Sequence, residues 1–186
     1  MLPPLFKNDT IDLTAKLKEK DIPYVFVDSK LEDSDYFAYY GMPMYKSGYL
    51  CASLLTERFG SGDVRKIVII RIRRDRTGKS DPTSERREGF LDYLSEKYPG
   101  CTTDQIFINP YDPEGTIRIL SDYFSGNPEV KHIVMFNSRI HLISEFLAGN
   151  KPEGAVVIGF DALEKNLAML RDGYLNILIA QHTEKQ

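Results

Sequence analysis

Short apolar runs alternate along this chain with stretches of helical spacing. Six runs rich in Val, Ile and Phe are typical of buried strands. Between them, apolar residues recur three and four positions apart, which predicts helices. Strands that alternate with helices form a parallel sheet, so we expect an α/β fold with helices on both faces of that sheet. The predicted strands are Pro23–Asp28, Lys66–Arg71, Asp104–Ile108, His132–Phe136, Ala155–Phe160 and Leu175–Ala180.

The helical stretches are bounded by residues that favour helix ends. Asp81–Pro82 and Asp112–Pro113 each place a capping carboxylate before a proline, which is typical of a helix start, and Asn137 or Ser138 can cap a later helix. Glycines follow four of the stretches, where a left-handed residue is favoured: Gly100, Gly126, Gly149 and Gly173. The apolar positions that mark the helices are Ile11, Leu13 and Leu17; Tyr45, Tyr49, Ala52, Leu55 and Phe59; Phe90, Leu91, Leu94 and Tyr98; Ile117, Leu120, Tyr123 and Phe124; Ile140, Ile143, Phe146 and Leu147; and Leu163, Leu167 and Leu170.

One segment interrupts this alternation. Lys30–Met44 is polar and then aromatic, and it contains Gly41 and Pro43, so it does not have the pattern of a long helix. We interpret it as the connection between a leading helix and strand, about residues 1–38, and a larger α/β body. A helix and one strand cannot form a core alone. The leading piece is therefore expected either to pack on the body or to belong to a lobe whose remainder is missing.

Composition narrows the class of protein. The 186 residues carry a net charge of −3, with 42% hydrophobic and 27% charged residues, as in ordinary globular proteins. The slight acidity argues against a protein that mainly coats nucleic acid. Cys51 and Cys101 are too few for a disulfide framework. Neither a membrane-spanning run nor a secretory signal is apparent, so we expect a cytoplasmic protein that does not associate with membranes.

Polar residues end the predicted strands, and in parallel sheets ligands bind beyond the carboxyl ends of the strands. Planar amide, carboxylate and guanidinium groups suit a ligand rich in hydroxyls, and Tyr40 is among the aromatic residues that could stack on a sugar ring. The alternative is that each polar residue only caps a helix or anchors a loop. The residues in question are Asp28, Arg71, Asn109, Asn137, Asp161 and Gln181, together with Arg86 and Arg87 at the start of a predicted helix.

The sequence contains little that indicates catalysis. His132, His141 and His182 are scattered, and neither metal-ligand spacing nor a nucleophile motif occurs. Gly78–Ser80 resembles the end of a phosphate-binding loop but lacks its upstream glycine. We therefore expect no enzyme, no cofactor and no metal. Arg65–Arg87 has nine basic and three acidic residues, which indicates either an anion site or a solvated loop.

Five segments in order resemble the effector-binding domain of LacI/GalR-type transcriptional regulators, which is shared with type I periplasmic sugar-binding proteins. The segments are Ile22–Asp28, Ser47–Tyr49, Arg86–Phe90, Val157–Asp161 and Gly173–Gln181. The resemblance implies two Rossmann-like lobes with the ligand in the cleft between them. It makes residues 1–38 a remnant of the N-terminal lobe, 39–43 a crossover, 44–181 the C-terminal effector-binding lobe and 182–186 the start of a returning crossover, so we expect the chain to be a fragment.

The same resemblance assigns residues to the site. It implies ligand-binding roles for Arg86, Asn137, Asp161 and Gln181, and possible ligand or hinge roles for Asp28, Tyr40 and Arg71. The family often has Asp or Asn in the crossover before the Ser47–Tyr49 helix, whereas this chain has Gly41–Met44 there. That difference leaves the identity of the ligand open.

Three functions are consistent with these observations. The first is the sensing domain of a LacI-type regulator. By family resemblance, it binds a small-molecule effector, a sugar or sugar derivative, and acts as a homodimer on DNA through a helix-turn-helix domain that this chain lacks. The second is the solute-binding protein of a sugar transporter, which would be exported. The third is a doubly wound sugar-processing enzyme, for which the sequence supplies neither a phosphate loop nor a placed base.

Overall fold

The computed structural model describes residues 1–4, 6–31, 34–58, 64–73, 81 and 83–180. The chain divides into two compact units. Of the described residues, the first takes in 1–4, 6–31, 34–43, 81, 83 and 84, and the second takes in 44–58, 64–73 and 85–180. None of the described helices is long and apolar enough to cross a membrane.

The first unit pairs one helix with two short parallel strands. It contains α1 (Lys7–Glu19), β1 (Val25–Val27) and β2 (Ala38–Tyr40), and Phe26 lies fully buried at its centre. The predicted helix around Ile11, Leu13 and Leu17 is confirmed, but Ile11 and Leu13 are both more than 40% exposed. Thr10 and Thr14 are buried instead. Their hydroxyls donate to main-chain oxygens one helical turn back, which satisfies the polar group inside the packing.

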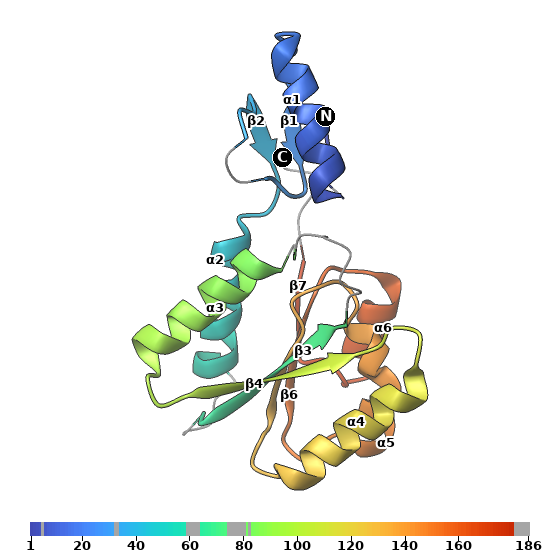
Figure 1. The fold of residues 1–186 in the computed structure, drawn as a ribbon. Helices are drawn as coiled ribbons and strands as arrows, with labels where there is room; N and C mark the ends of the chain where they lie inside the picture. Colours follow the sequence, from blue (N-terminus) through green and yellow to red (C-terminus); the bar gives the residue numbers. More distant parts are fainter. Residues whose placement is uncertain (5, 32–33, 59–63, 74–80, 82, 181–186) are drawn as a thin grey trace. The chain divides into compact units, whose positions relative to one another are not determined.

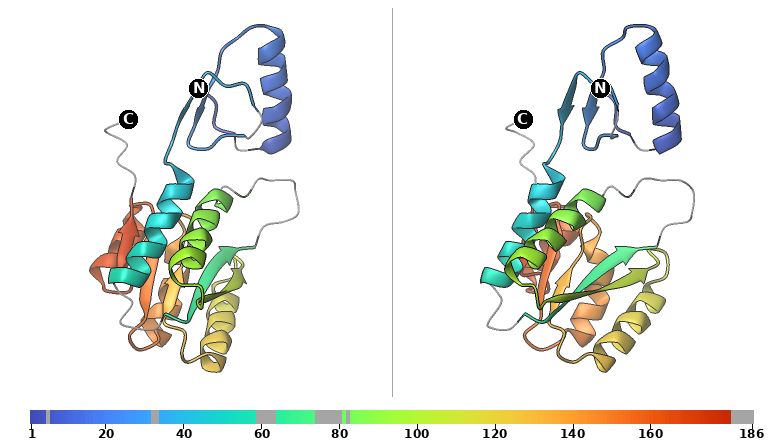
Figure 2. Two further views of the ribbon diagram at one scale, coloured as in Figure 1. Left: turned by 90° about the vertical axis from the view of Figure 1, so that its left-hand side faces the viewer. Right: turned by 60° about the vertical axis from the view of Figure 1, so that its left-hand side comes forward.

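The second unit is a five-stranded parallel sheet covered by helices on both faces, which confirms the predicted fold class (Figures 1 and 2). The strand order is β4-β3-β5-β6-β7, so the chain starts in the sheet interior and later strands are added on either side. The strands are β3 (Lys66–Ile72), β4 (Thr102–Ile108), β5 (His132–Val134), β6 (Val156–Phe160) and β7 (Ile177–Ile179).

Alternate residues of each central strand enter different hydrophobic clusters. Ile67 and Ile69 pack with α2 (Met44–Ser53) and α3 (Ser84–Lys97), whereas Val68 and Ile70 pack with the helices of the opposite face. Burial on both faces explains why this strand is apolar throughout its middle. The opposite face is covered by α4 (Pro113–Gly126), α5 (Ser144–Asn150) and α6 (Glu164–Arg171), with a 3₁₀ turn at Ile140–Ile143; a π-helical turn, Leu54–Arg58, extends α2.

Helices α2 and α3 cross at two glycines. A Cβ atom on Gly48 would overlap the carbonyl oxygen of Arg86, and one on Gly89 would overlap that of Tyr45. Both glycines therefore allow the two backbones to approach closely. Tyr45 also donates to Asp92 across the pair of helices at 2.8 Å. The Ser47–Tyr49 and Arg86–Phe90 motifs thus include the contact surface between the two helices.

Several local predictions can be compared with the structure. Asp112 caps α4, accepting from the Gly115 amide at 2.9 Å, as predicted. Strand β2 was not predicted because Ala38–Tyr40 is a short aromatic segment within Lys30–Met44, and none of its residues is buried. Gly173 has the predicted left-handed conformation, with φ of +75°, but Gly100, Gly126 and Gly149 do not, so those three predictions are wrong.

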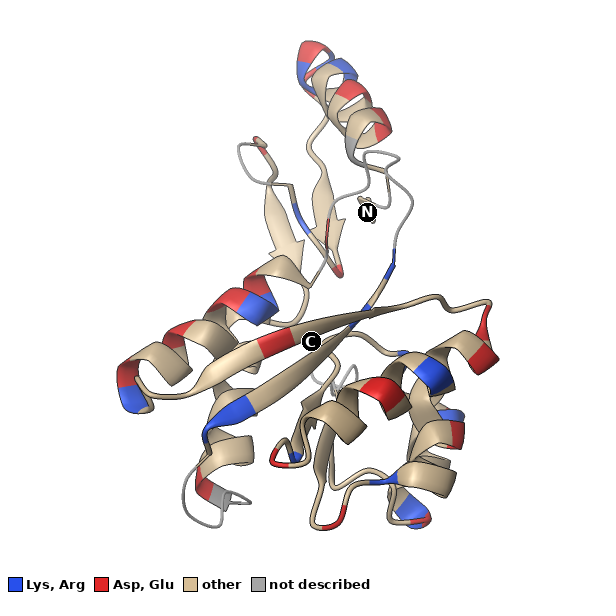
Figure 3. Cartoon of the chain, turned by 60° about the horizontal axis from the view of Figure 1, so that its bottom comes forward, with Lys and Arg blue, Asp and Glu red and all other residues tan. Residues whose placement is uncertain are grey.

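Acidic and basic residues are mixed along the described helices (Figure 3). Helix α3, for example, carries Glu85, Arg86, Arg87 and Glu88 in succession, followed by Asp92 and Lys97. Part of the basic stretch singled out in the sequence, residues 74–80 and 82, lies outside the described residues. The anion-site interpretation of that stretch therefore stays a prediction.

Candidate ligand-binding site

Asn137 and Asp161 follow neighbouring parallel strands at the carboxyl edge of the five-stranded sheet. Asn137 comes three residues after β5, and its Oδ1 accepts from the Arg139 amide at 2.9 Å. Asp161 comes directly after β6 and has a φ of +66°, a left-handed conformation that Asp tolerates better than most side chains. Its amide donates to the Ile179 carbonyl of β7 at 2.9 Å, so the turn begins at a fixed point of the sheet.

Arg86 lies beneath this edge and is only 4% exposed. Its Nε donates to Ser47 Oγ at 3.0 Å, and one terminal nitrogen donates to the carbonyl oxygen of Phe136. The guanidinium carbon lies 4.0 Å from the centroid of the Phe160 ring, a cation–π arrangement. Since Phe136 and Phe160 directly precede Asn137 and Asp161, Arg86 connects the two chain segments that carry the predicted ligand residues.

Asn166, which the sequence analysis did not identify, connects the same two segments from the other side of the sheet. It lies on α6 and is fully buried. Its Nδ2 is 2.9 Å from the Ser138 carbonyl, 3.1 Å from the Phe160 carbonyl and 2.9 Å from the Asp161 carbonyl. The structure therefore brings Arg86, Asn137 and Asp161 together through main-chain contacts of their neighbours.

Sequence reasoning missed Asn166 because it assumed a different inner face of α6. The predicted face included Leu163 and Leu170, but these side chains are 46% and 38% exposed. Asn166 and Met169, three residues apart, form the buried face instead. The three-residue spacing of Asn166 and Met169 was the signal in the sequence. It was overlooked because Leu163, Leu167 and Leu170 also have helical spacing.

Gly159 allows the segment after β5 to lie against β6. A Cβ atom there would come within 2.7 Å of Ile140 Cγ2, and Ile140 is fully buried. The glycine of the Val157–Asp161 motif therefore makes room for the turn that follows Asn137. This contact adds an apolar restraint to the polar ones that position the edge.

Other predicted site residues lie elsewhere in the chain. Arg71 donates to Gln105 Oε1 at 2.9 Å and its guanidinium carbon lies 5.1 Å from the Phe107 ring centroid, so its described contacts are with the edge strand β4. Asp28 and Tyr40 belong to the first unit, where the Asp28 amide donates to the Tyr40 carbonyl at 2.9 Å. Gln181 lies outside the described residues.

Asp28 and Asp161 occupy matching positions in the two sheets. Each follows a parallel strand, has a positive φ and donates its amide to the last residue of the neighbouring strand. The Tyr39 hydroxyl lies 3.0 Å from the Asp28 carbonyl and 3.3 Å from the Met42 carbonyl, which ties the segment around Gly41 back to β1. In this way, Tyr39 supplies a polar contact at the crossover where the sequence lacks the Asp or Asn of the resembling family.

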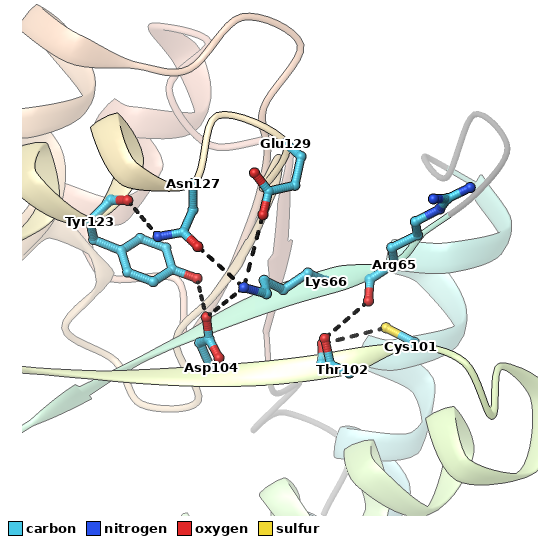
Figure 4. Close-up of polar contacts among 8 residues, drawn as sticks. All are labelled: Arg65, Lys66, Cys101, Thr102, Asp104, Tyr123, Asn127 and Glu129. Carbon is cyan, nitrogen blue, oxygen red and sulfur yellow. Dashed lines mark hydrogen bonds and ion pairs between the residues drawn. The ribbon is translucent and has the colours of Figure 1, made fainter.

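A polar cluster with shifted pKa values lies at the amino end of the sheet (Figure 4). The Tyr123 hydroxyl donates to Asp104 at 2.8 Å, and Lys66 Nζ lies 3.2 Å from the same carboxylate. The Tyr123 hydrogen bond, assisted by Lys66, lowers the pKa of Asp104, while burial and the carboxylate raise the pKa of Tyr123. Each polar group is paired within the cluster, so its chemistry is that of a structural ion pair.

The described residues contain no group of three or more His, Cys, Asp or Glu side chains placed to hold a metal ion. Within the same part of the chain, every deeply buried side-chain nitrogen or oxygen has a hydrogen-bond partner. The arrangement at the carboxyl edge therefore offers hydrogen-bond donors and acceptors on a rigid support. Such an arrangement is suited to binding a polar molecule and positions no evident nucleophile.

A parallel α/β unit with polar side chains gathered beyond its strands defines a ligand-binding class of protein. The chain belongs to the periplasmic binding protein domain family, whose pattern matches residues 2–186. It is 21% identical over 163 residues to the ribose import binding protein RbsB of Bacillus subtilis (strain 168), an alignment that covers 88% of this chain and 50% of that protein. The chain thus spans about half the length of this curated relative.

Solved structures show the same fold. A candidate LacI transcriptional regulator from Bacteroides fragilis is 31% identical with a TM-score of 0.83, covering 96% of this chain and 61% of that one. GanP, a glucose-galactose binding protein from Geobacillus stearothermophilus, is 19% identical with a TM-score of 0.74, covering 95% and 61% respectively. The similar proteins therefore include both a regulator and transport-type binding proteins.

Proposed function

We propose that this chain is the effector-binding part of a LacI-type transcriptional regulator and that its effector is a sugar or a sugar derivative. The observation that carries the proposal is the placement of Asn137 and Asp161 beyond the neighbouring strands β5 and β6, each next to a residue that buried Arg86 contacts. A carboxylate accepts from sugar hydroxyls, and an amide both donates and accepts. Rigid placement of such groups favours hydroxyl-rich ligands over apolar ones.

Similarity to the Bacteroides protein supports a regulator over a transport protein. Its identity of 31% and TM-score of 0.83 exceed the values for GanP. A regulator of this kind requires a DNA-binding helix-turn-helix domain outside this chain, acts as a homodimer and works in the cytoplasm. An effector controls it only if its affinity differs between two conformations of the protein. That the ligand lies between two lobes and that Gln181 contributes to the site both stay predictions.

The second candidate is the solute-binding protein of a sugar transporter. Similarity to the ribose import binding protein and to GanP supports it. The sequence upstream in the natural reading frame separates the two candidates. A helix-turn-helix module there supports a regulator, whereas a signal peptide supports a transport protein.

Sugar binding is tested by calorimetric titration of the full natural protein with D-ribose, D-arabinose, D-glucose and D-galactose. At least one sugar is expected to bind, and Asp161→Asn and Asn137→Ala are each expected to weaken it about 10-fold or more, the range for a charged or paired hydrogen bond. Asp122→Asn on the exposed side of α4 makes the same chemical change away from the site and should leave affinity unchanged. Absence of binding across the panel would contradict the proposal.

A further inference from the structure

Asn166 is the point at which three main-chain oxygens of the candidate site converge. The side-chain nitrogen lies 2.9 Å from the carbonyl of Ser138, next to Asn137, and 2.9 Å from the carbonyl of Asp161 itself. It also lies 3.1 Å from the Phe160 carbonyl. A primary amide has two N–H groups, so these three oxygens share them. One side chain thereby holds together the turns that follow β5 and β6.

The three carbonyls determine which way round this amide sits, and His141 is the partner of its oxygen. Its Nδ1 lies 3.0 Å from Asn166 Oδ1. The three carbonyls accept hydrogen bonds only, so the amide NH₂ faces them and Oδ1 faces the imidazole. Oδ1 accepts only, and Nδ1 must therefore carry a proton. Both the neutral Nδ1–H tautomer and the charged imidazolium meet that requirement, so the contact does not depend on the charge of His141.

We propose that Asn166 is a positioning residue for the sugar site, and that His141 acts through it by anchoring the amide oxygen. The inference rests on the proposed function for its ligand. Hydrogen bonds to a ligand depend on placement within about 0.5 Å, and supporting contacts supply that precision. The Asp161 carbonyl also accepts from the Leu163 amide. The turn after β6 is therefore restrained both by its own main chain and by Asn166.

Two substitutions separate the halves of this arrangement. Asn166→Asp keeps an oxygen toward His141 but removes the N–H donors to the three carbonyls. His141→Phe keeps the donors of Asn166 but removes the N–H group that anchors its amide oxygen. Leu120→Ala is the matched control, because Leu120 lies on α4, is fully buried in the core cluster of that face and makes none of these contacts. It lowers stability through a cavity without altering the edge.

The first measurement needs no ligand. Amide hydrogen exchange in the full natural protein reports the Arg139 amide, bonded to Asn137 Oδ1, and the Leu163 amide, bonded to the Asp161 carbonyl. Both amides should exchange faster in Asn166→Asp and in His141→Phe, relative to the core strands of the same variant. In Leu120→Ala they should change only as much as the core does. Unchanged relative exchange in both site variants would overturn the inference.

The second measurement is calorimetric titration with the sugar of the four-member panel that the wild type binds. Asn166→Asp and His141→Phe should each raise the dissociation constant at least about 10-fold, comparable to loss of an outer partner in other sites. The dissociation constant of Leu120→Ala should stay within about twofold of the wild-type value, although this variant loses a similar amount of thermal stability. A folded Asn166→Asp variant with wild-type affinity would also overturn the inference. If the wild type binds no sugar, the proposed function fails, while the exchange measurement still decides the role of Asn166.

Discussion

The guanidinium of Arg86 lies over the ring of Phe160, with its central carbon 4.0 Å from the ring centroid. The two residues are 74 positions apart in the sequence, since 160 − 86 = 74. Arg86 also donates to Ser47 and to the Phe136 carbonyl, so one buried cation joins α2, the end of β5 and the end of β6. Removal of this group leaves several partners unsatisfied at once.

Arg86→Lys is expected to lower the free energy of unfolding by about 2–4 kcal/mol, because an ammonium group cannot reproduce the planar stacking or the divergent donors. Urea titration followed by circular dichroism measures the change. Arg118→Lys, on the exposed side of α4, is the control and should stay within about 0.5 kcal/mol. Equal stability of the two variants would contradict the structural role of Arg86.

Gly48→Ala and Gly89→Ala test the close crossing of α2 and α3. In each variant the new methyl group would overlap a main-chain carbonyl oxygen of the other helix, and backbone cannot move aside as a side-chain tip can. We expect each substitution to reduce stability by about 1–3 kcal/mol, despite the better helix propensity of Ala.

Gly149→Ala is the control for the glycine pair. Gly149 lies in α5, and a Cβ atom there meets no atom within 4 Å. This variant should be as stable as the wild type or up to about 1 kcal/mol more stable. If Gly48→Ala unfolded at the same temperature as Gly149→Ala, the two helices could not approach as closely as the structure shows.

The sequence predicted what depends on periodicity. The apolar run at Lys66–Arg71 identified a strand buried on both faces. Asn137 and Asp161 follow β5 and β6 at the carboxyl edge, and their ligand-binding role stays a prediction. That edge follows from the parallel connection of strands and helices alone. The fold class could therefore be predicted without knowing any side-chain contact.

What the sequence did not predict depends on contacts between distant segments. Arg86 was expected to contact ligand, but its burial depends on Ser47, Phe136 and Phe160 closing around it, and no local pattern encodes that. Whether it also contacts a ligand stays a prediction. His141 was dismissed as one of three scattered histidines, although its partner Asn166 lies 25 residues away. Polar networks of this kind are recognised only when the turns they join are seen together.

The Lys66–Asp104–Tyr123 cluster predicts a specific pH dependence (Figure 4). The pKa of Asp104 is lowered from 3.8, so its stabilising contribution is present above about pH 4 and is lost as the pH falls through the lowered pKa. The pKa of Tyr123 is raised above 10, so its contribution is present below about pH 10 and is lost as the pH rises through the raised value. The Asp104 side chain is 40% exposed, and solvent screening limits its contribution to about 1 kcal/mol or less.

A double-mutant cycle measures this pair directly. Asp104→Asn and Tyr123→Phe, alone and combined, are compared by urea unfolding at pH 7 and at pH 2. We expect a favourable coupling between the two residues at pH 7 that shrinks at pH 2, where the carboxyl group becomes protonated and a weaker acceptor. Coupling of the same size at both pH values would show that the charge of Asp104 does not contribute.

The two thiols should report separately on the second unit. Cys51 is completely buried beside Ile67 and Phe90, and burial raises the pKa of its thiol far above the usual range. Cys101 is half-buried, and burial also raises its pKa. With a thiol reagent in native buffer at pH 8, we expect Cys101 to react first. Cys51 should react at least about 10³-fold more slowly than a free thiol, because its reaction requires unfolding of the core.

A Cys101→Ser variant isolates the Cys51 reaction. Its rate should rise steeply with urea below the unfolding midpoint, in proportion to the unfolded fraction. Gly48→Ala, one helical turn from Cys51, should accelerate the reaction by the factor that its loss of stability dictates, whereas Gly149→Ala should not. A Cys51 rate that does not change with urea would mean that reagent reaches the thiol through a local opening, and that α2 does not seal this core cluster.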